Sequence, residues 1–240
     1  MFFRRIGLLF LTLLLAWCVP IYGSEEEKHL DKKQAFSFKP GSRFFQSSEF
    51  TDAWKIGTSD LTCFNIELAY EVKLKKSIGL EFSFGHSASS AISHNVLFDN
   101  DFSELDLSIA YFSPSAKYYY PLNNTFILYG GVGPDIYYTY GEHYYRTEGY
   151  TPINLKFSQL MYGLHGLIGL EYYIYKNPGK GNFFDWPVSL ELQYKYSLVI
   201  KESIEEELIN SINSNMELSL TQNDIDIGGH IITLGLKWHF

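Results

Sequence analysis

The chain has 240 residues, of which 46% are hydrophobic and 18% aromatic, and its formal net charge is −8. This acidic balance disfavours nucleic acid as a partner, because the phosphate backbone attracts basic surfaces. Beyond residue 23 the chain has no apolar run of the roughly 20 residues that a membrane-spanning helix needs. Strands of about 9 to 11 residues can also cross a bilayer if they close into a barrel.

The first 23 residues have the features of a cleavable export signal. Arg4 and Arg5 precede a mainly apolar stretch, residues 6–19, and the small Gly23 follows the helix-breaking Pro20. We expect cleavage after Gly23. The mature chain then keeps 17 basic and 27 acidic residues, a formal charge of −10.

Two other readings of this segment remain, a transmembrane anchor and a lipoprotein modified at Cys18. The apolar run is short for a span and leads directly into a charged stretch, residues 24–33. Trp17 is larger than the residue that normally precedes a lipid-modified cysteine. Residues 24–35 are expected to be a charged periplasmic segment, and Cys63 to remain as a structural thiol without a disulfide partner.

Residues 36–240 contain eight segments in which apolar residues recur at every second position, the pattern of β-strands. In chain order they are residues 36–48, 61–74, 77–86, 104–120, 125–141, 158–175, 187–200 and 225–240. In residues 104–120 the apolar positions are odd-numbered through Tyr111 and even-numbered from Phe112. This change predicts a one-residue bulge near Ser113 and Pro114.

The connections between these segments alternate between long and short, as in outer-membrane barrels. The sixth, residues 176–186, is the exception, because it should be a short periplasmic turn.

A water-soluble β-sandwich is the competing fold. Two features favour the barrel. Charged residues lie opposite the apolar stripe: Lys39, Arg43, Glu67, Glu71, Glu81, Asp106, Lys117, Asp135, Glu171, Glu191, Lys195 and Lys237. Aromatic residues gather near strand ends, where membrane girdles lie: Tyr118, Tyr119, Tyr120, Tyr137, Tyr138, Tyr140, Tyr172, Tyr173, Tyr175, Phe183, Phe184, Trp186 and Trp238.

Together with the export signal, this pattern predicts an all-β fold, an eight-stranded antiparallel up-and-down transmembrane β-barrel. Residues 113–122 (SPSAKYYYPL) with residues 126–133 (FILYGGVG) resemble the central hairpin of small outer-membrane barrels of the OmpW and OmpX type. The closing LGLKWHF resembles their terminal insertion signal. The resemblance implies a protein of the cell outer membrane in contact with lipids and lipopolysaccharide, and recognition of Phe240 by the barrel-assembly machinery. The opening FKPGSRFF and the long acidic loop 201–224 depart from the OmpW pattern, and no peptidoglycan-binding domain of the OmpA kind is expected after Phe240.

Eight strands enclose an interior that side chains can fill, so a broad aqueous pore is disfavoured and a buried ion-pair network is expected. We expect a monomer with a structural or surface-interacting role, or one that passes small hydrophobic molecules, as the OmpW resemblance suggests. No enzyme, cofactor or metal site is expected, since the histidines show no metal-ligand spacing on a shared face. The alternative is a lipid A-modifying hydrolase, for which residues 86–90 (HSASS) offer a base and nucleophiles. The spacing is poor, because Ala88 takes the place two residues after His86.

Overall fold

The computed structural model describes residues 33–45, 63–94, 102–146, 152–175, 186–200, 202–203, 224–225 and 227–240. The expected export signal, most of segment 24–35 and most of loop 201–224 lie outside these residues. The strands are β1 (Gln34–Phe45), β2 (Cys63–Lys75), β3 (Ile78–His94), β4 (Phe102–Pro121), β5 (Phe126–Arg146), β6 (Ile153–Tyr175), β7 (Val188–Val199), β8 (Glu202–Ser203), β9 (Asp224–Ile225) and β10 (Gly229–His239). The described residues include no helix long and apolar enough to cross a membrane.

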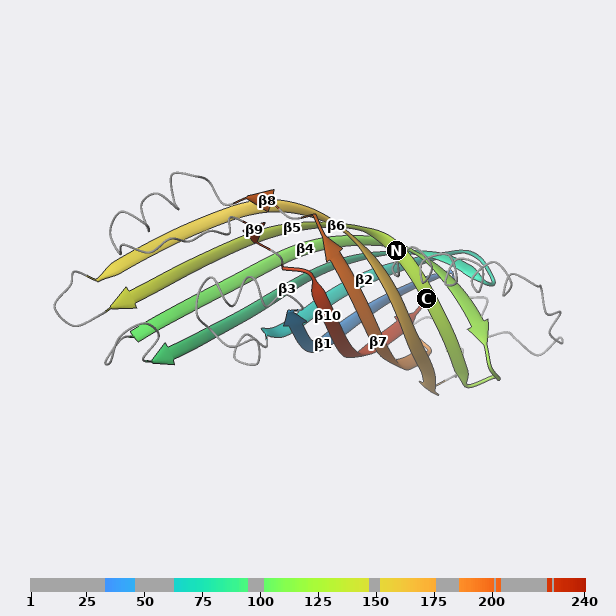
Figure 1. Ribbon diagram of the computed structural model, residues 1–240. Coiled ribbons are helices and arrows are strands. Elements are labelled where there is room, and N and C mark those ends of the chain that lie inside the picture. The colour runs from blue at the N-terminus through green and yellow to red at the C-terminus, as the bar shows by residue number, and fades with distance from the viewer. Residues whose placement is uncertain are drawn as a thin grey trace, which may run out of the picture.

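Eight of these strands form one closed antiparallel barrel in the order β1-β10-β7-β6-β5-β4-β3-β2, and β8 pairs with β9 beside it (Figure 1). The first and last barrel strands close the wall. Phe36 faces Trp238 in their register, and the backbones of Gln34 and Phe240 exchange hydrogen bonds of 3.2 and 2.9 Å. The predicted eight-stranded barrel is confirmed.

The two faces of the wall differ in chemistry along every barrel strand. Odd-numbered side chains face the lumen and even-numbered side chains face outward, since neighbouring side chains of a strand point to opposite faces. Cys63 is 0% exposed, for example, whereas the adjacent Phe64 is 59% exposed. Large apolar side chains left exposed in this way form the band that lipid covers.

The predicted bulge in β4 is wrong. The β3–β4 register runs without a shift from Ile78 opposite Tyr118 to His94 opposite Phe102. The parity change arises because the odd-numbered apolar residues of β4 point into the lumen: Leu105, Leu107, Ile109 and Tyr111. Asp106, which was expected inside, therefore faces outward.

The girdle assignment also needs correction for three tyrosines. Tyr119, Tyr137 and Tyr173 are buried in the lumen, whereas Tyr138 and Tyr172 are exposed on the outer face as expected. Alternation alone identifies two faces but does not say which is lipid-facing. An apolar lumen position is therefore indistinguishable from a lipid-facing one in the sequence.

Four neighbouring strands, β3–β6, form a tall wall on one side of the barrel (Figure 1). They have 17, 20, 21 and 23 residues, against 12, 13, 12 and 11 in β1, β2, β7 and β10. The predicted connections 87–103 and 142–157 were therefore too long, because strand pairing continues past the lipid band. The first strand is shifted to Gln34–Phe45, and β7 begins at Val188, so the long sixth connection is retained.

Candidate functional site

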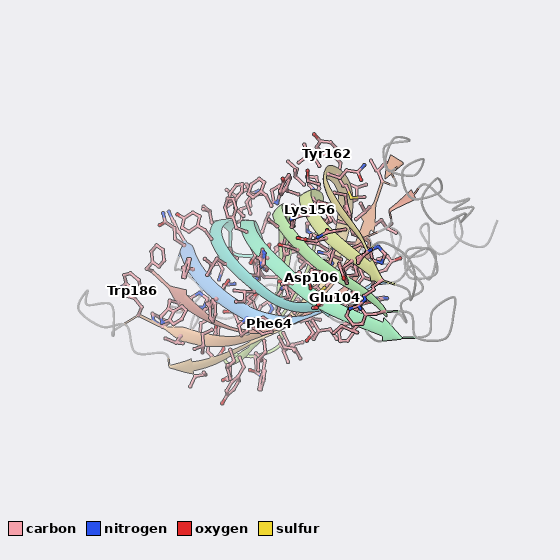
Figure 2. The ribbon with its side chains drawn as sticks, turned by 90° about the vertical axis from the view of Figure 1, so that its left-hand side faces the viewer. Phe64, Glu104, Asp106, Lys156, Tyr162 and Trp186 are labelled. Carbon is pink, nitrogen blue, oxygen red and sulfur yellow. The ribbon has the colours of Figure 1, made fainter. Side chains whose placement is uncertain are left out.

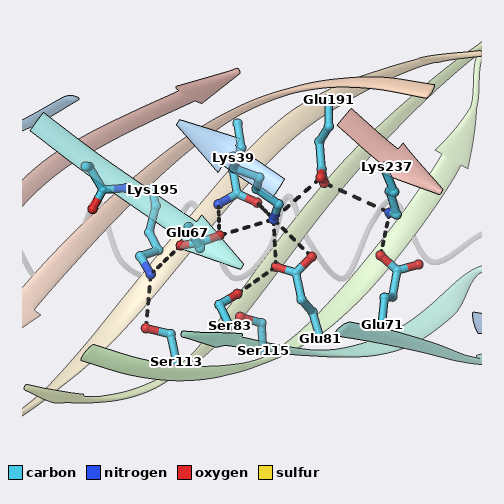
Figure 3. Close-up of polar contacts among 12 residues, drawn as sticks. Lys39, Glu67, Glu71, Glu81, Ser83, Ser113, Ser115, Glu191, Lys195 and Lys237 are labelled. Atoms are coloured by element: carbon cyan, nitrogen blue, oxygen red, sulfur yellow. Dashed lines mark hydrogen bonds and ion pairs between the residues drawn. The ribbon is translucent and has the colours of Figure 1, made fainter. Parts of the chain in front are cut away.

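The lumen is closed by a group of charged side chains that we call the lumen network. It consists of Lys39, Lys117, Lys195, Lys237, Glu67, Glu71, Glu81, Asp135, Glu171 and Glu191, drawn in part in Figure 3. All ten side chains were expected inside, and all are buried. Charges taken out of water are stable only when they are paired and hydrogen-bonded, so the stability of the network depends on the contacts of each member.

Lys39 lies at the centre of the network. Its Nζ is 3.2 Å from Glu67 Oε1, 3.1 Å from Glu81 Oε2 and 3.5 Å from Glu191 Oε2. It also donates a hydrogen bond to Gln193 Oε1 at 3.1 Å. One lysine from β1 thus joins carboxylates from β2, β3 and β7 across the lumen (Figure 3).

Two further lysines extend the network toward the end of the barrel that carries the termini. Lys117 pairs with Glu81 and lies 3.4 Å from Glu191. Lys237 contacts Glu71 at 2.5 Å and Glu171 at 3.2 Å. These contacts cross the lumen, so they leave no straight aqueous path at this level.

Tyrosine rings fill the space that inward glycines leave beside the network. A Cβ on Gly169 would come within 2.2 Å of the Tyr129 ring, and one on Gly85 within 2.0 Å of the Tyr111 ring. The Tyr111 hydroxyl donates to Glu67 at 3.0 Å and to Asn65 at 3.1 Å. Inward glycines of β3 and β6 thus make room for tyrosine rings of the neighbouring strands β4 and β5.

Ser115, His165 and Asp135 are hydrogen-bonded in the order of a serine hydrolase triad. His165 Nε2 lies 2.8 Å from Ser115 Oγ, and its Nδ1 lies 2.8 Å from Asp135 Oδ1. Ser115 and His165 are each 4% exposed, however, and Asp135 also accepts hydrogen bonds from Ser113 and Tyr137. We read this group as part of the buried polar packing, since no substrate carbonyl can approach Ser115.

The HSASS segment lies within β3, so strand geometry separates its members. His86 faces outward and Ser87 is buried, where it donates to Asn65 at 2.8 Å. His86 Nε2 instead lies 2.9 Å from Ser108 Oγ of β4, a contact that sequence spacing could not identify. Among the described residues no carboxylate lies within ion-pair distance of His86, so the third member that would orient a catalytic histidine is missing from this contact.

The outer half of the lumen is apolar, which sequence reasoning missed. Its side chains form the outer apolar cluster: Phe45, Cys63, Ala91, Leu105, Leu107, Ile109, Tyr111, Tyr137, Phe157, Met161, Ile227 and Ile231. With eight strands, both termini lie at the periplasmic end, so this cluster occupies the external end. The signal in the sequence that could have indicated this apolar region is the change from odd to even apolar positions in β4.

Polar side chains replace the lipid band on the outer face of the tall wall. Ser90, Asp106, Glu142 and Lys156 face one another in register across the four strands. Lys156 Nζ lies 3.2 Å from Glu142 Oε2, and a hydrogen bond from Asn154, assisted by Lys156, lowers the pKa of the Glu142 carboxyl. Figure 2 shows Glu104, Asp106 and Lys156 toward one end of the long strands and Trp186 toward the other. The tall wall therefore rises out of the lipid.

The described part of the chain holds no group of three or more His, Cys, Asp or Glu side chains that could bind a metal ion.

A family model described as the outer membrane protein β-barrel domain matches residues 32–240. Comparison with curated proteins finds no matching sequence. Among solved structures, OprG from Pseudomonas aeruginosa is 14% identical, with a TM-score of 0.46, over 87% of this chain and 97% of that chain. Ail, the attachment invasion locus protein of Yersinia pestis, is 15% identical, with a TM-score of 0.45, over 87% of this chain and 99% of that one. Neisserial surface protein A is 14% identical, with a TM-score of 0.45, over 86% and 95%.

Proposed function

Since this chain belongs to the outer membrane protein β-barrel domain family and resides in the cell outer membrane, we propose that it is a non-conducting barrel that acts at the cell surface. The tall wall, β3–β6, carries this role. The observation behind the proposal is the filled lumen, in which Lys39 alone contacts carboxylates of three strands. A solute pore would need these side chains to move apart, which would leave buried charges without partners.

The outer face of the tall wall supplies the chemistry for surface contacts. It combines acidic side chains, Asp106 and Glu142, with Lys156 and the hydrogen-bonding pair His86 and Ser108. Hydrogen bonding between neighbouring strands holds these groups in fixed register. A rigid polar surface of this kind suits recognition of another surface better than solute passage does.

Two measurements test the proposal together. In planar bilayers the purified barrel should give no steady channel current. Cells that display the wild-type protein should adhere to a host or phage surface, and a variant with Asp106→Asn, Glu142→Gln and Lys156→Met should lose that adhesion. A matched triple variant on the lipid band, Leu164→Val, Leu192→Val and Leu234→Val, should adhere like the wild type. Steady conductance together with unchanged adhesion of the polar variant would contradict the proposal.

Passage of small hydrophobic molecules is the second candidate, and the outer apolar cluster favours it. The β6–β7 ladder begins only at Gly163 opposite Val199, so residues 153–161 of β6 have no described strand on that side. Liposome uptake of a hydrophobic fluorescent probe that depends on the barrel would support this role over the surface role.

We further propose that the protein is a monomer in contact with outer-membrane lipids and lipopolysaccharide, and that the barrel-assembly machinery recognises Phe240. The lipid-facing position of Trp238 and the exposed Leu236 and Leu234 support such a signal, because they follow one another at every second position up to the terminal residue. Phe240 itself packs against Trp186, with ring centroids 4.8 Å apart.

A further inference from the structure

The turn between β4 and β5 carries a cavity at the rim of the barrel. The cavity has a volume of about 600 Å³ and is lined by Asn123, Asn124, Thr125, Phe126 and Tyr172. This volume lies within the range of roughly 300 to 1,000 Å³ that small-molecule sites have. None of the five lining residues belongs to the lumen network or to the polar groups proposed for surface contacts, so neither of those roles explains the cavity.

Register and hydrogen bonds place this cavity at the end of the barrel that carries the chain termini. The Tyr173 N–H donates to the Thr125 carbonyl oxygen at 2.9 Å, and Tyr173 pairs with Ser189 of β7. β10 and β1 follow β7 around the wall, and they meet at this end through the backbones of Gln34 and Phe240. With eight strands this end faces the periplasm. A ligand of the cavity is therefore a periplasmic molecule.

The backbone of the turn is largely occupied by its own hydrogen bonds. Asn123 Oδ1 accepts from the N–H groups of Thr125 and Phe126 at 2.8 and 2.9 Å. The N–H groups of Leu122 and Asn123 donate to the Phe126 carbonyl oxygen at 2.9 and 3.3 Å. A phosphate group is usually held by free backbone N–H groups or by basic side chains, and none of the five described lining residues is charged. The cavity therefore favours an uncharged ligand.

The side chains of the lining combine two aromatic rings with amide and hydroxyl groups. Phe126 and Tyr172 face each other in the β5–β6 register, with ring centroids 4.9 Å apart, and Tyr172 is 39% exposed. The face of an aromatic ring is electron-rich and attracts C–H groups that carry a partial positive charge. Because Asn123 Oδ1 is bound within the turn, the two N–H groups of its Nδ2 are the donors that it offers to a ligand.

From this lining we propose that the cavity binds an N-acetylated hexose unit of a glycan strand, the sugar polymer of the cell wall. The C–H face of the sugar ring packs on Tyr172 and Phe126, and the acetamido carbonyl oxygen accepts a hydrogen bond from Asn123 Nδ2. A purely apolar ligand would leave the amide donors unpaired, and a phospholipid head group would bring a phosphate charge that the lining cannot pair. Several barrels can hold one strand at once, so weak single contacts add up to a tether between membrane and wall.

The test uses the folded barrel in lipid nanodiscs, with two trisaccharides as probes. Chitotriose consists of N-acetylglucosamine units, whereas cellotriose consists of glucose units and lacks the acetamido groups. The backbone amide signals of residues 122–126 and 172–173 should shift saturably with chitotriose. Cellotriose should bind about tenfold more weakly, because the hydrogen bond to the acetamido group is lost. In a second assay the barrel should sediment with insoluble cell-wall sacculi, which offer the N-acetylated unit in a polymer.

Two variants at the site and one control separate its contacts. Asn123→Asp keeps an oxygen for the N–H groups of Thr125 and Phe126 but removes the amide donors, and it should weaken chitotriose binding about tenfold. Tyr172→Leu keeps an apolar outward side chain but removes the ring, and it should also weaken chitotriose binding about tenfold. Tyr138→Leu changes another exposed tyrosine, toward the external end of β5, and should leave binding at the wild-type level.

The shifts of the wild-type protein decide the question even where a variant does not fold. Equal binding of the two trisaccharides, or chitotriose binding unchanged in both site variants, would overturn the proposal. So would the absence of saturable shifts at this turn, or displacement of chitotriose by dihexanoylphosphatidylethanolamine, which would assign the cavity to a lipid head group. A barrel that binds chitotriose but does not sediment with sacculi would contradict the assignment to a cell-wall strand. Adhesion of cells that display Asn123→Asp should stay at the wild-type level, so this site and the surface role can fail separately.

Discussion

Individual lumen side chains depend on one another because each buried charge is held by several partners. Lys39 is the clearest example, since its Nζ lies between Glu67, Glu81 and Glu191. Such groups stabilise the barrel as a set and not as separate pairs. Removal of one member leaves its buried neighbours charged and with one partner fewer, which costs more than the lost contact itself.

We therefore expect Lys39→Met to lower the free energy of unfolding by about 3 to 5 kcal/mol, because three carboxylates lose their shared cation in a dry interior. Guanidinium unfolding of the barrel in lipid vesicles measures this change. The control is Lys156→Met, whose lysine is 60% exposed in its pair with Glu142 and should therefore change the free energy of unfolding far less. Equal effects of the two substitutions would argue against a dry, coupled network.

At the scale of single strands, the sequence predicts the barrel strands well where one face meets lipid and the other meets the lumen network. In β7 the apolar Leu190 and Leu192 alternate with Glu191 and Gln193, and both the strand and its inward face follow directly. The same reasoning fails in the upper part of β4. There Leu107 faces inward and Asp106 outward, because water lies outside the wall and apolar side chains lie inside it.

The contacts across the lumen could not be predicted from the sequence. The inward parity of Lys39 and Glu191 is readable, but the distance between them depends on how the barrel closes. Equally, nothing in the spacing of residues 86–90 shows that His86 meets Ser108 on the next strand. Register between strands and the length of strand beyond the membrane are tertiary properties.

Residues 153–161 of β6, which have no described strand on their β7 side, lead to a prediction about proline. Ile200 donates to the Tyr162 carbonyl oxygen at 2.8 Å and Tyr173 donates to Thr125, so even-numbered backbone groups of β6 point toward the β7 side and odd-numbered ones toward β5. Ser158→Pro removes an N–H on the side that has no described partner strand and should leave the barrel intact. Gln159→Pro removes an N–H from the β5–β6 ladder and should destabilise the tall wall by about 3 kcal/mol or more.

Hydrogen exchange of the β5–β6 hairpin distinguishes the two proline variants. Exchange should rise across residues 136–146 in Gln159→Pro and stay at the wild-type level in Ser158→Pro. Gln159→Ala separates the loss of the side chain from that of the N–H group. If Ser158→Pro opened the hairpin as much as Gln159→Pro, the β7 side of this stretch would have to be paired.

For the whole molecule, closure depends on the last strand. β10 pairs with β1 on one side and β7 on the other, and Phe240 joins both the backbone of Gln34 and the ring of Trp186. Substitution of Phe240 is therefore expected to weaken the closure of the barrel and the recognition by the assembly machinery that we propose.

We expect Phe240→Ser to reduce the amount of folded protein in the outer membrane by about tenfold. The substitution removes the burial of an aromatic ring, which stabilises the barrel by roughly 2 kcal/mol, and it removes the terminal signal at the same time. The fraction that keeps its compact mobility on unheated SDS gels measures this. Phe240→Trp, which keeps an aromatic terminus, should assemble normally. Refolding of Phe240→Ser in pure lipid vesicles separates the two causes, because only closure matters there.

The β1–β10 seam has a consequence for how the protein reaches its membrane. Phe36 and Trp238 stand opposite each other although 202 positions separate them in the chain. Pairings so distant in sequence form slowly, because closing the long intervening loop costs entropy before the stabilising contacts can form. The wall can therefore close only after the last strand has been synthesised, and until then the outward apolar side chains of the earlier strands belong to no closed barrel.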